Sequence, residues 1–184
     1  FGGARLGLRF IPEAVMMLKT GIPKLLLMTE VTGTDQEELL GELNTLDNQV
    51  AEKFGYRSRV MKHDEAEKYW KIRRESFSLL RKHVKGLHTA PFIDDIVVPV
   101  ESLPEFMPKI QAILDREKFI YTIAGHAGNG NFHIIPLLDF KKEGIADQVT
   151  RLSNEVYDLI ASYHGSITGE HNDGIVRTPY LHKQ

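Results

Sequence analysis

The chain has 184 residues, enough for one substantial domain, and its 23 basic and 25 acidic residues leave a net charge of −2. This balance of charges produces no electrostatic field suited to binding nucleic acid, and no apolar run approaches the ~18–20 residues of a membrane span. We therefore expect neither a nucleic-acid partner nor a transmembrane segment. The lack of cysteine excludes disulfides, thiolate metal sites and cysteine nucleophiles. Phe1 opens the chain in place of Met, without a targeting leader, so we expect a segment of a longer protein.

The first half of the chain alternates between strand-like apolar runs and amphipathic helices. Residues 23–31 form an apolar run that predicts a buried strand. Thr34-Asp35-Gln36-Glu37 is typical of a capping box, and it predicts the start of a helix. A second strand is expected over residues 56–61, and a charged helix over residues 64–84.

The second half continues this alternation around a hairpin. A strand is expected over residues 92–100, and Ser102-Leu103-Pro104-Glu105 predicts a second capping box. Two strands flank residues 125–133, and residues 145–160 carry apolar side chains at helical spacing. Together these elements predict an α+β fold with a largely antiparallel sheet and helices packed on one side.

Residues 125–133, Gly-His-Ala-Gly-Asn-Gly-Asn-Phe-His, contain the dipeptide best suited to a two-residue type I′ hairpin turn, Asn129-Gly130. Such a turn pairs His126 directly with His133, with Cβ atoms about 4.5–5.5 Å apart. Two imidazoles at that spacing can reach one metal ion. Two polar residues on a solvated face of a hairpin would give the same pattern.

Glu170 is the best candidate for a third ligand. It follows Gly165, Ser166 and Gly169 at the expected exit of a strand, where an acidic side chain can point into a cleft. Two imidazoles and a carboxylate suit Zn²⁺, Mn²⁺ or Fe²⁺ and leave coordination positions open, which favours a catalytic or substrate-binding role. A metal-dependent hydrolase and a non-catalytic metal-binding module are alternatives that fit the same three ligands.

Three further positions carry chemistry. His171 can be a fourth ligand, a surface residue or a general base, since an unperturbed histidine has a pKa near ~6.5. Arg73 can bind a substrate carboxylate, or it can belong to the solvated face of the charged helix. Asp94-Asp95 can serve metal or acid–base chemistry, or it can end a strand and bind backbone amides.

Four motifs occur in a fixed order along the chain: Trp70-Lys71-Ile72-Arg73, residues 91–103, residues 125–133 and residues 169–174. Together they resemble the C-terminal domain of FAD-linked oxidases. These are the glycolate oxidase, D-lactate dehydrogenase and D-2-hydroxyglutarate dehydrogenase relatives within the vanillyl-alcohol oxidase type of flavoprotein. The resemblance implies that residues 1–184 are a substrate-binding cap domain with a ferredoxin-like sheet, lying over FAD held by a flavin-binding domain absent from this chain.

Carried over to matching positions, the resemblance implies that His126, His133 and Glu170 bind a divalent metal. It also implies that Arg73 binds the substrate carboxylate and that His171 takes the hydroxyl proton. The implied reaction is oxidation of a D-2-hydroxy acid, with hydride passing from C2 to flavin N5. The implied partners are a small 2-hydroxy acid and the flavin-binding domain. A cytoplasmic protein, free or peripheral to a membrane, fits the composition, and homo-oligomerisation stays open.

Two apolar positions bear on the substrate. Phe77 and Ile93 stand where relatives of the 2-hydroxyglutarate type offer polar groups to a second carboxylate. We therefore expect a lactate-like or glycolate-like substrate rather than a dicarboxylate. Asn172-Asp173 also differs from the Gly that follows Glu-His in many relatives, so the loop beyond the expected base differs as well.

Overall fold

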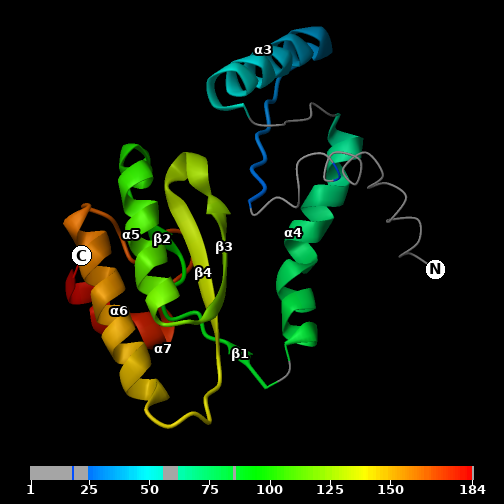
Figure 1. Ribbon diagram of the computed structural model, residues 1–184. Helices are drawn as coiled ribbons and strands as arrows, with labels where there is room; N and C mark the ends of the chain where they lie inside the picture. The colour runs from blue at the N-terminus through cyan, green and yellow to red at the C-terminus, as the bar shows by residue number, and fades with distance from the viewer. Residues whose placement is uncertain (1–17, 19–24, 56–61, 85, 184) are drawn as a thin grey trace. The chain divides into compact units, whose positions relative to one another are not determined.

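The computed structural model describes residues 18, 25–55, 62–84 and 86–183, without the side chains of residues 76–83. The chain divides into two compact units, Phe1–Ser76 and Phe77–Gln184. The main elements, in chain order, are α3 (Gln36–Phe54), α4 (His63–His83), β1 (His88–Thr89), β2 (Ile96–Val97), α5 (Leu103–Arg116), β3 (Ile120–His126), β4 (Asn131–Leu138), α6 (Ile145–Ser162) and α7 (Gly174–Arg177) (Figure 1).

Both helices expected in the first half of the chain are present. α3 begins one residue later than the capping box predicted, because its N-cap is Asp35, whose carboxylate accepts hydrogen bonds from the backbone amides of Glu37 and Glu38 at 2.8 and 3.2 Å. The strand expected over residues 23–31 is wrong: the described part, residues 25–31, is irregular and mostly exposed. An apolar run alone does not make a strand, which needs a neighbouring backbone to bond. The strand expected over residues 56–61 lies outside the described residues.

The second unit is built around β4. β3 pairs antiparallel with β4 along residues 131–137. β3 takes one edge of β4, so β1 and β2 lie along the other edge of β4. β1 pairs with residues 137–138 and β2 pairs with residues 131–132, and both are antiparallel to β4. The predicted α+β class and antiparallel sheet are confirmed. The ferredoxin-like detail stays a prediction.

The hairpin confirms the two expected strands and corrects the expected turn. His126 pairs with Asn131, and Ala124 pairs with His133, so residues 127–130 form a four-residue loop. The register is therefore shifted by two residues from the predicted pairing of His126 with His133. Since side chains alternate with a period of two, this shift keeps both histidines on the same face of the sheet, as diagonal neighbours.

Packing against β2 selects this longer loop. Ala127–Asn129 forms a 3₁₀ turn, and Gly130 follows with a left-handed φ of 67°. The Gly130 carbonyl accepts a hydrogen bond from the Val98 amide at 3.0 Å. A Cβ on residue 130 would lie 1.8 Å from the Val98 carbonyl oxygen, so only glycine fits here.

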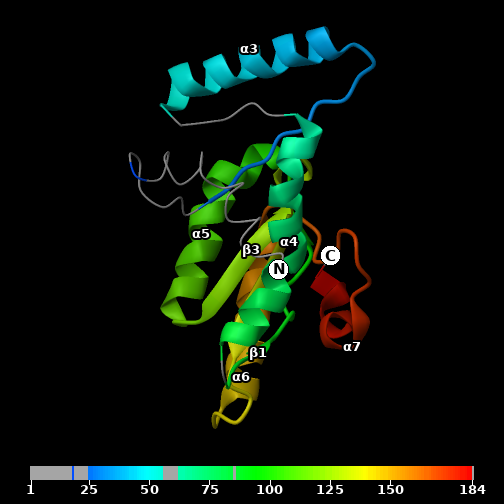
Figure 2. The same ribbon diagram turned by 90° about the vertical axis from the view of Figure 1, so that its right-hand side faces the viewer.

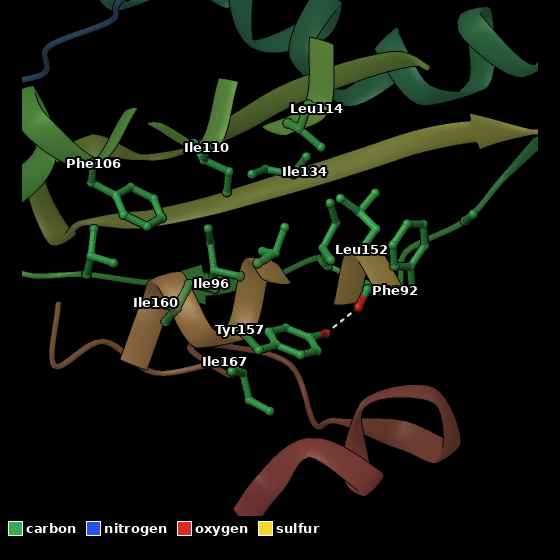
Figure 3. Close-up of a cluster of buried hydrophobic side chains, with 14 of the residues drawn as sticks. Phe92, Ile96, Phe106, Ile110, Leu114, Ile134, Leu152, Tyr157, Ile160 and Ile167 are labelled. Carbon is green, nitrogen blue, oxygen red and sulfur yellow. Dashed lines mark hydrogen bonds between the residues drawn. The ribbon is translucent and has the colours of Figure 1, made fainter. Parts of the chain in front are cut away.

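The core lies between the sheet and the helices α5 and α6, which are side by side (Figure 1). Figure 3 shows their inward side chains meeting those of β4. The fully buried hydrophobic residues on these three elements are Phe106, Ile110, Leu114, Ile134, Leu138, Leu152, Val156, Tyr157 and Ile160. The Tyr157 hydroxyl donates a hydrogen bond to the Phe92 carbonyl, so its burial leaves that polar group satisfied (Figure 3). The helices expected over residues 64–84 and 145–160 and the helix after residue 102 are confirmed.

Two local predictions in this unit are wrong. The strand expected over residues 92–100 shrinks to Ile96–Val97, because Asp95 has a left-handed φ of 62° that interrupts the extended backbone. Ser102 makes no side-chain cap to α5. It already lies in a 3₁₀ turn with helical φ and ψ, whereas a capping side chain needs an extended backbone.

Within the described residues, no helix is both long enough and apolar enough to cross a bilayer.

Candidate functional site

The two histidines lie on the sheet face that points away from α5 and α6. Ile134 and Leu138 of β4 are buried in the core, and His133, which alternates with them, points to the other face. His126 occupies the same face on β3, and the two imidazole centroids are 6.2 Å apart. In Figure 2 the C-terminal segment with α7 lies on the other side of β3 from α5. The sheet therefore presents its histidine face to a different part of the chain.

Glu170 lies between the two histidines. Its Oε1 is 3.3 Å from His126 Nε2, and its Oε2 is 3.4 Å from His133 Nε2. His171 adds a third imidazole, with Nε2 at 3.6 Å from Glu170 Oε2. His133 is the most enclosed of these side chains, at 12% exposure, while the other three are between 42% and 61% exposed. One carboxylate and three imidazoles thus form an open cluster that solvent and small molecules can reach.

Backbone pairing with β2 brings the Glu170 segment to this place. Val97 and Ser166 exchange two backbone hydrogen bonds, of 2.9 and 2.8 Å. A Cβ on Gly165 would lie 2.4 Å from the Val97 carbonyl oxygen, and a Cβ on Gly169 would lie 2.6 Å from the Asn131 amide nitrogen. The small residues noted before Glu170 are therefore needed for the close approach of this segment to the sheet.

Asp95 fastens the loop that carries Glu170. Its fully buried carboxylate accepts hydrogen bonds from the backbone amides of Gly169, Glu170 and His171, at 2.7–3.1 Å, and from the Asn131 side-chain amide at 3.0 Å. Burial by itself would raise the pKa of Asp95, but these hydrogen bonds outweigh it and lower the pKa below its usual value. Of the alternatives for Asp94-Asp95, the structure favours amide binding for Asp95.

Asp94 contacts a histidine instead of the backbone of that loop. Its Oδ1 lies 3.1 Å from His133 Nδ1, and both side chains are largely enclosed, at 18% and 12% exposure. A carboxylate beside Nδ1 favours the tautomer with its proton on that nitrogen. His133 Nε2, the nitrogen that faces Glu170, then keeps its lone pair.

Two distances in the cluster can be compared with the spacing of ligand atoms in a tetrahedral metal site. With ligand distances of about 2.0–2.2 Å, neighbouring ligand atoms in a tetrahedral site lie about 3.4 Å apart. The Glu170 oxygens lie 3.3 and 3.4 Å from the Nε2 atoms of His126 and His133. This matches the tetrahedral spacing and is longer than a hydrogen bond of ordinary length.

Among the described residues, the group of possible ligands whose donor atoms all lie close to one another does not include His126. Asp95, His133, Glu170 and His171 each offer one donor atom, all within 4.8 Å of one another, and this set replaces His126 with Asp95. We favour the set with His126, because the Asp95 oxygens already accept the four N–H donors described above and keep no lone pair for a metal. His171 fits either a fourth ligand or a base.

The comparisons with known proteins bear on these motifs. The family model described as "FAD linked oxidases, C-terminal domain" matches residues 16–184. The chain belongs to this family. The match covers all of the described site, so its residues can be compared with those of other members of the FAD linked oxidases.

Individual relatives are 27–32% identical to this FAD linked oxidase domain over the aligned residues. It is 32% identical over 160 residues to the mitochondrial D-lactate dehydrogenase [cytochrome] of Arabidopsis thaliana, covering 86% of this chain and 28% of the relative. It is 31% identical to the D-2-hydroxyglutarate dehydrogenase of Haemophilus influenzae, covering 64% and 11%. It is 27% identical to the glycolate oxidase subunit GlcD of Bacillus subtilis, covering 64% and 24%. The chain thus spans less than a third of the length of these relatives.

The structure describes the side chains of two other predicted residues of this FAD linked oxidase domain. Arg73 lies on α4 in the first unit, with its guanidinium 5.9 Å from the centre of the Trp70 ring, and its role in substrate binding stays a prediction. Ile93 is fully buried in the core and does not line the site, which removes one of the two residues used to argue against a dicarboxylate. The side chain of the other, Phe77, lies outside the description.

The role of Arg177 was not predicted from the sequence. Its guanidinium is 4% exposed and donates hydrogen bonds to the carbonyls of Asp94, Ile167 and Asn172, and it lies 3.8 Å from Asp95 Oδ2. The sequence does place this cation inside a short apolar stretch near Glu170, but that pattern does not predict which carbonyls the guanidinium will bond to.

Proposed function

We propose that this domain binds one divalent metal ion through His126, His133 and Glu170, and that it supplies the substrate-binding part of an FAD-dependent dehydrogenase or oxidase of D-2-hydroxy acids. The observation that carries the proposal is the position of the Glu170 carboxylate between two imidazole nitrogens, at 3.3 and 3.4 Å. Two histidines and one carboxylate bind Zn²⁺, Mn²⁺ or Fe²⁺ and leave positions open for a substrate. Membership of the FAD linked oxidases supports the flavin part of the proposal.

The residues of this chain would divide the remaining work. A metal held by His126, His133 and Glu170 would supply a Lewis acid that lowers the pKa of the substrate hydroxyl, and FAD would supply the hydride acceptor. His171 takes the hydroxyl proton: its ring is 61% exposed, and its Nε2 lies 3.6 Å from Glu170, so a substrate at the open face of the cluster can reach it. Arg73 pairs with the substrate carboxylate through two parallel hydrogen bonds.

For the substrate we propose a lactate-like or glycolate-like acid. A relative matched over 86% of this chain is named a D-lactate dehydrogenase, and another is named a glycolate oxidase subunit. D-2-hydroxyglutarate is the competing substrate, since several relatives carry that name.

The test is steady-state oxidation of D-lactate, glycolate and D-2-hydroxyglutarate by the purified protein with an artificial electron acceptor. His133→Ala is expected to lower kcat/KM by more than about 100-fold, since even residues that only support a metal ligand cost about 10- to 100-fold. His88→Ala removes an exposed histidine of β1, outside the cluster, and is expected to change little. Equal turnover by the His133→Ala and His88→Ala variants would contradict the proposal. Hydrolysis of an ester or phosphate by the metal-loaded protein, without oxidation of any acid, would favour a hydrolase.

A further inference from the structure

Two adjacent carboxylates reach the proposed ligands from different directions. Asp94 contacts the ring of His133, and Asp95 contacts the backbone of Glu170 and His171. Successive side chains of an extended strand point to opposite faces. The left-handed φ of 62° at Asp95 breaks this alternation just before β2, and both carboxylates face parts of the same cluster. Asp and Asn are among the residues that adopt this backbone conformation most readily.

Asp94 acts on the orientation of a ring. Its Oδ1 accepts the Nδ1 proton of His133 at 3.1 Å, in surroundings where both side chains are mostly enclosed. This hydrogen bond limits rotation of the imidazole, fixes the tautomer and makes Nε2 a stronger electron donor. Nε2 is the atom that faces Glu170 Oε2 at 3.4 Å. The hydrogen bond to Asp94 therefore leaves the Nε2 lone pair of His133 available for a metal ion.

Asp95 acts on the position of a loop. Its two oxygens accept three consecutive backbone amides, those of Gly169, Glu170 and His171, so the loop wraps around a buried anion. Gly169 packs so closely that a Cβ there would lie 3.1 Å from Asp95 Oδ1. The guanidinium of Arg177, itself 4% exposed, compensates the buried charge from 3.8 Å.

We propose that Asp94 and Asp95 are positioning residues for the metal site: Asp94 fixes the ring of His133, and Asp95 fixes the loop that carries Glu170 and His171. This inference rests on the proposed metal role of His126, His133 and Glu170. Neither carboxylate touches substrate or metal in this scheme. Both act by reducing the freedom of groups that do, so their loss lowers metal affinity while the three ligands remain in the chain.

The test measures Zn²⁺ affinity by competition with a chromophoric chelator, in the full protein and four variants. Asp94→Ala removes the acceptor and is expected to weaken Zn²⁺ binding about 10- to 100-fold. Asp94→Asn keeps an oxygen that can accept the Nδ1 proton, and it is expected to restore most of that loss. Asp95→Asn keeps a residue that adopts the left-handed backbone readily, but its side-chain NH₂ group would face backbone amides that are also donors. We therefore expect a loss of Zn²⁺ affinity of similar size. Asp147→Asn, an exposed residue in the first turn of α6, is the matched control and is expected to bind like the parent.

The visible spectrum of the Co²⁺-loaded protein gives a second measurement independent of turnover. The ligand-field bands are expected to shift in Asp94→Ala and to return toward the parent position in Asp94→Asn, which a general loss of stability would not produce. If the parent binds Zn²⁺, and Asp94→Ala binds it within twofold of the parent and gives the same Co²⁺ spectrum, the positioning role of Asp94 is wrong. The proposed metal role of His126, His133 and Glu170 is then unaffected. A parent without stoichiometric metal overturns the proposed metal role, and the inference falls with it.

Discussion

Replacing Arg177 by alanine should loosen the loop that carries Glu170 and His171. The guanidinium donates to the carbonyls of Asp94 and Ile167 inside the protein, and to those of Asn172 and His171 nearer the surface. Removal leaves all four carbonyls without this donor. Asn172 and His171 are exposed, so water replaces the guanidinium at those two carbonyls.

The magnitude follows from the two enclosed carbonyls. Ile167 and Arg177 are 1% and 4% exposed, so water reaches this place poorly. Leaving a buried acceptor unsatisfied costs about 1–3 kcal/mol. The Ile167 carbonyl is buried, and the Asp94 carbonyl is only partly buried and costs about 1 kcal/mol, so together they suggest a loss of about 2–4 kcal/mol in the free energy of opening the loop. The neighbouring Asp95 carboxylate also loses its compensating charge, which acts in the same direction. Every ~1.4 kcal/mol is a factor of ten, so this corresponds to about 30- to 700-fold.

Amide hydrogen exchange followed by mass spectrometry measures this opening directly. The amides of Gly169, Glu170 and His171 donate to Asp95 and should exchange slowly in the parent. Their exchange should accelerate by the factor above in Arg177→Ala. Arg151→Ala is the matched control, because Arg151 is 62% exposed in a surface ion pair worth about 0–1 kcal/mol. Acceleration of less than threefold at these amides would refute the reasoning about Arg177.

Three further changes test other parts of the structure. Gly169→Ala places a Cβ 2.6 Å from Asn131 Nδ2 and should displace the loop and weaken Zn²⁺ binding, whereas Gly41→Ala on α3, where a Cβ meets nothing within 4 Å, should not. Leu152→Ala empties a fully buried position and should lower the free energy of unfolding of the second unit by about 2–5 kcal/mol in urea titrations; a loss below about 1 kcal/mol would contradict its place in the core. Glu117→Gln should lower the free energy of unfolding by about 1–2 kcal/mol at pH 7 and by less at pH 3. Burial raises the pKa of Glu117, but Gln148 and the nearby arginines lower it below 4.5 overall, so the charged form stabilises the fold above pH 4.5 and this contribution disappears as the pH falls through the lowered pKa. A parent and a variant that differ equally at both pH values would contradict that assignment.

The histidine pair shows how far local sequence rules reach. Alternating apolar residues around a glycine-rich turn predicted the strands, and the period of two placed both histidines on one face. The turn type was wrong because Asn129-Gly130 satisfies a two-residue turn locally, while contact with Val98 of another segment selects a four-residue loop. The predicted face of the two histidines was still right because the register error was an even number of residues.

The supporting residues mark the limit of such rules. Adjacent aspartates before an apolar run fit a metal site, a strand end or an amide-binding loop, and only the fold brings residues 169–171 against Asp95. The short extent of β2 is also tied to Asp95, whose left-handed backbone ends the extended segment. Arg177 is a comparable case, since its carbonyl partners come from three separate segments.

The most direct measurement of the central claim is the anomalous scattering of a Zn²⁺-loaded crystal of the protein, recorded on both sides of the zinc absorption edge. We expect one strong anomalous peak bound by the Nε2 atoms of His126 and His133 and by the Glu170 carboxylate, with the Nδ1 atom of His133 still bonded to Asp94. No peak at this cluster, or a peak bound through Asp95 without His126, would contradict it.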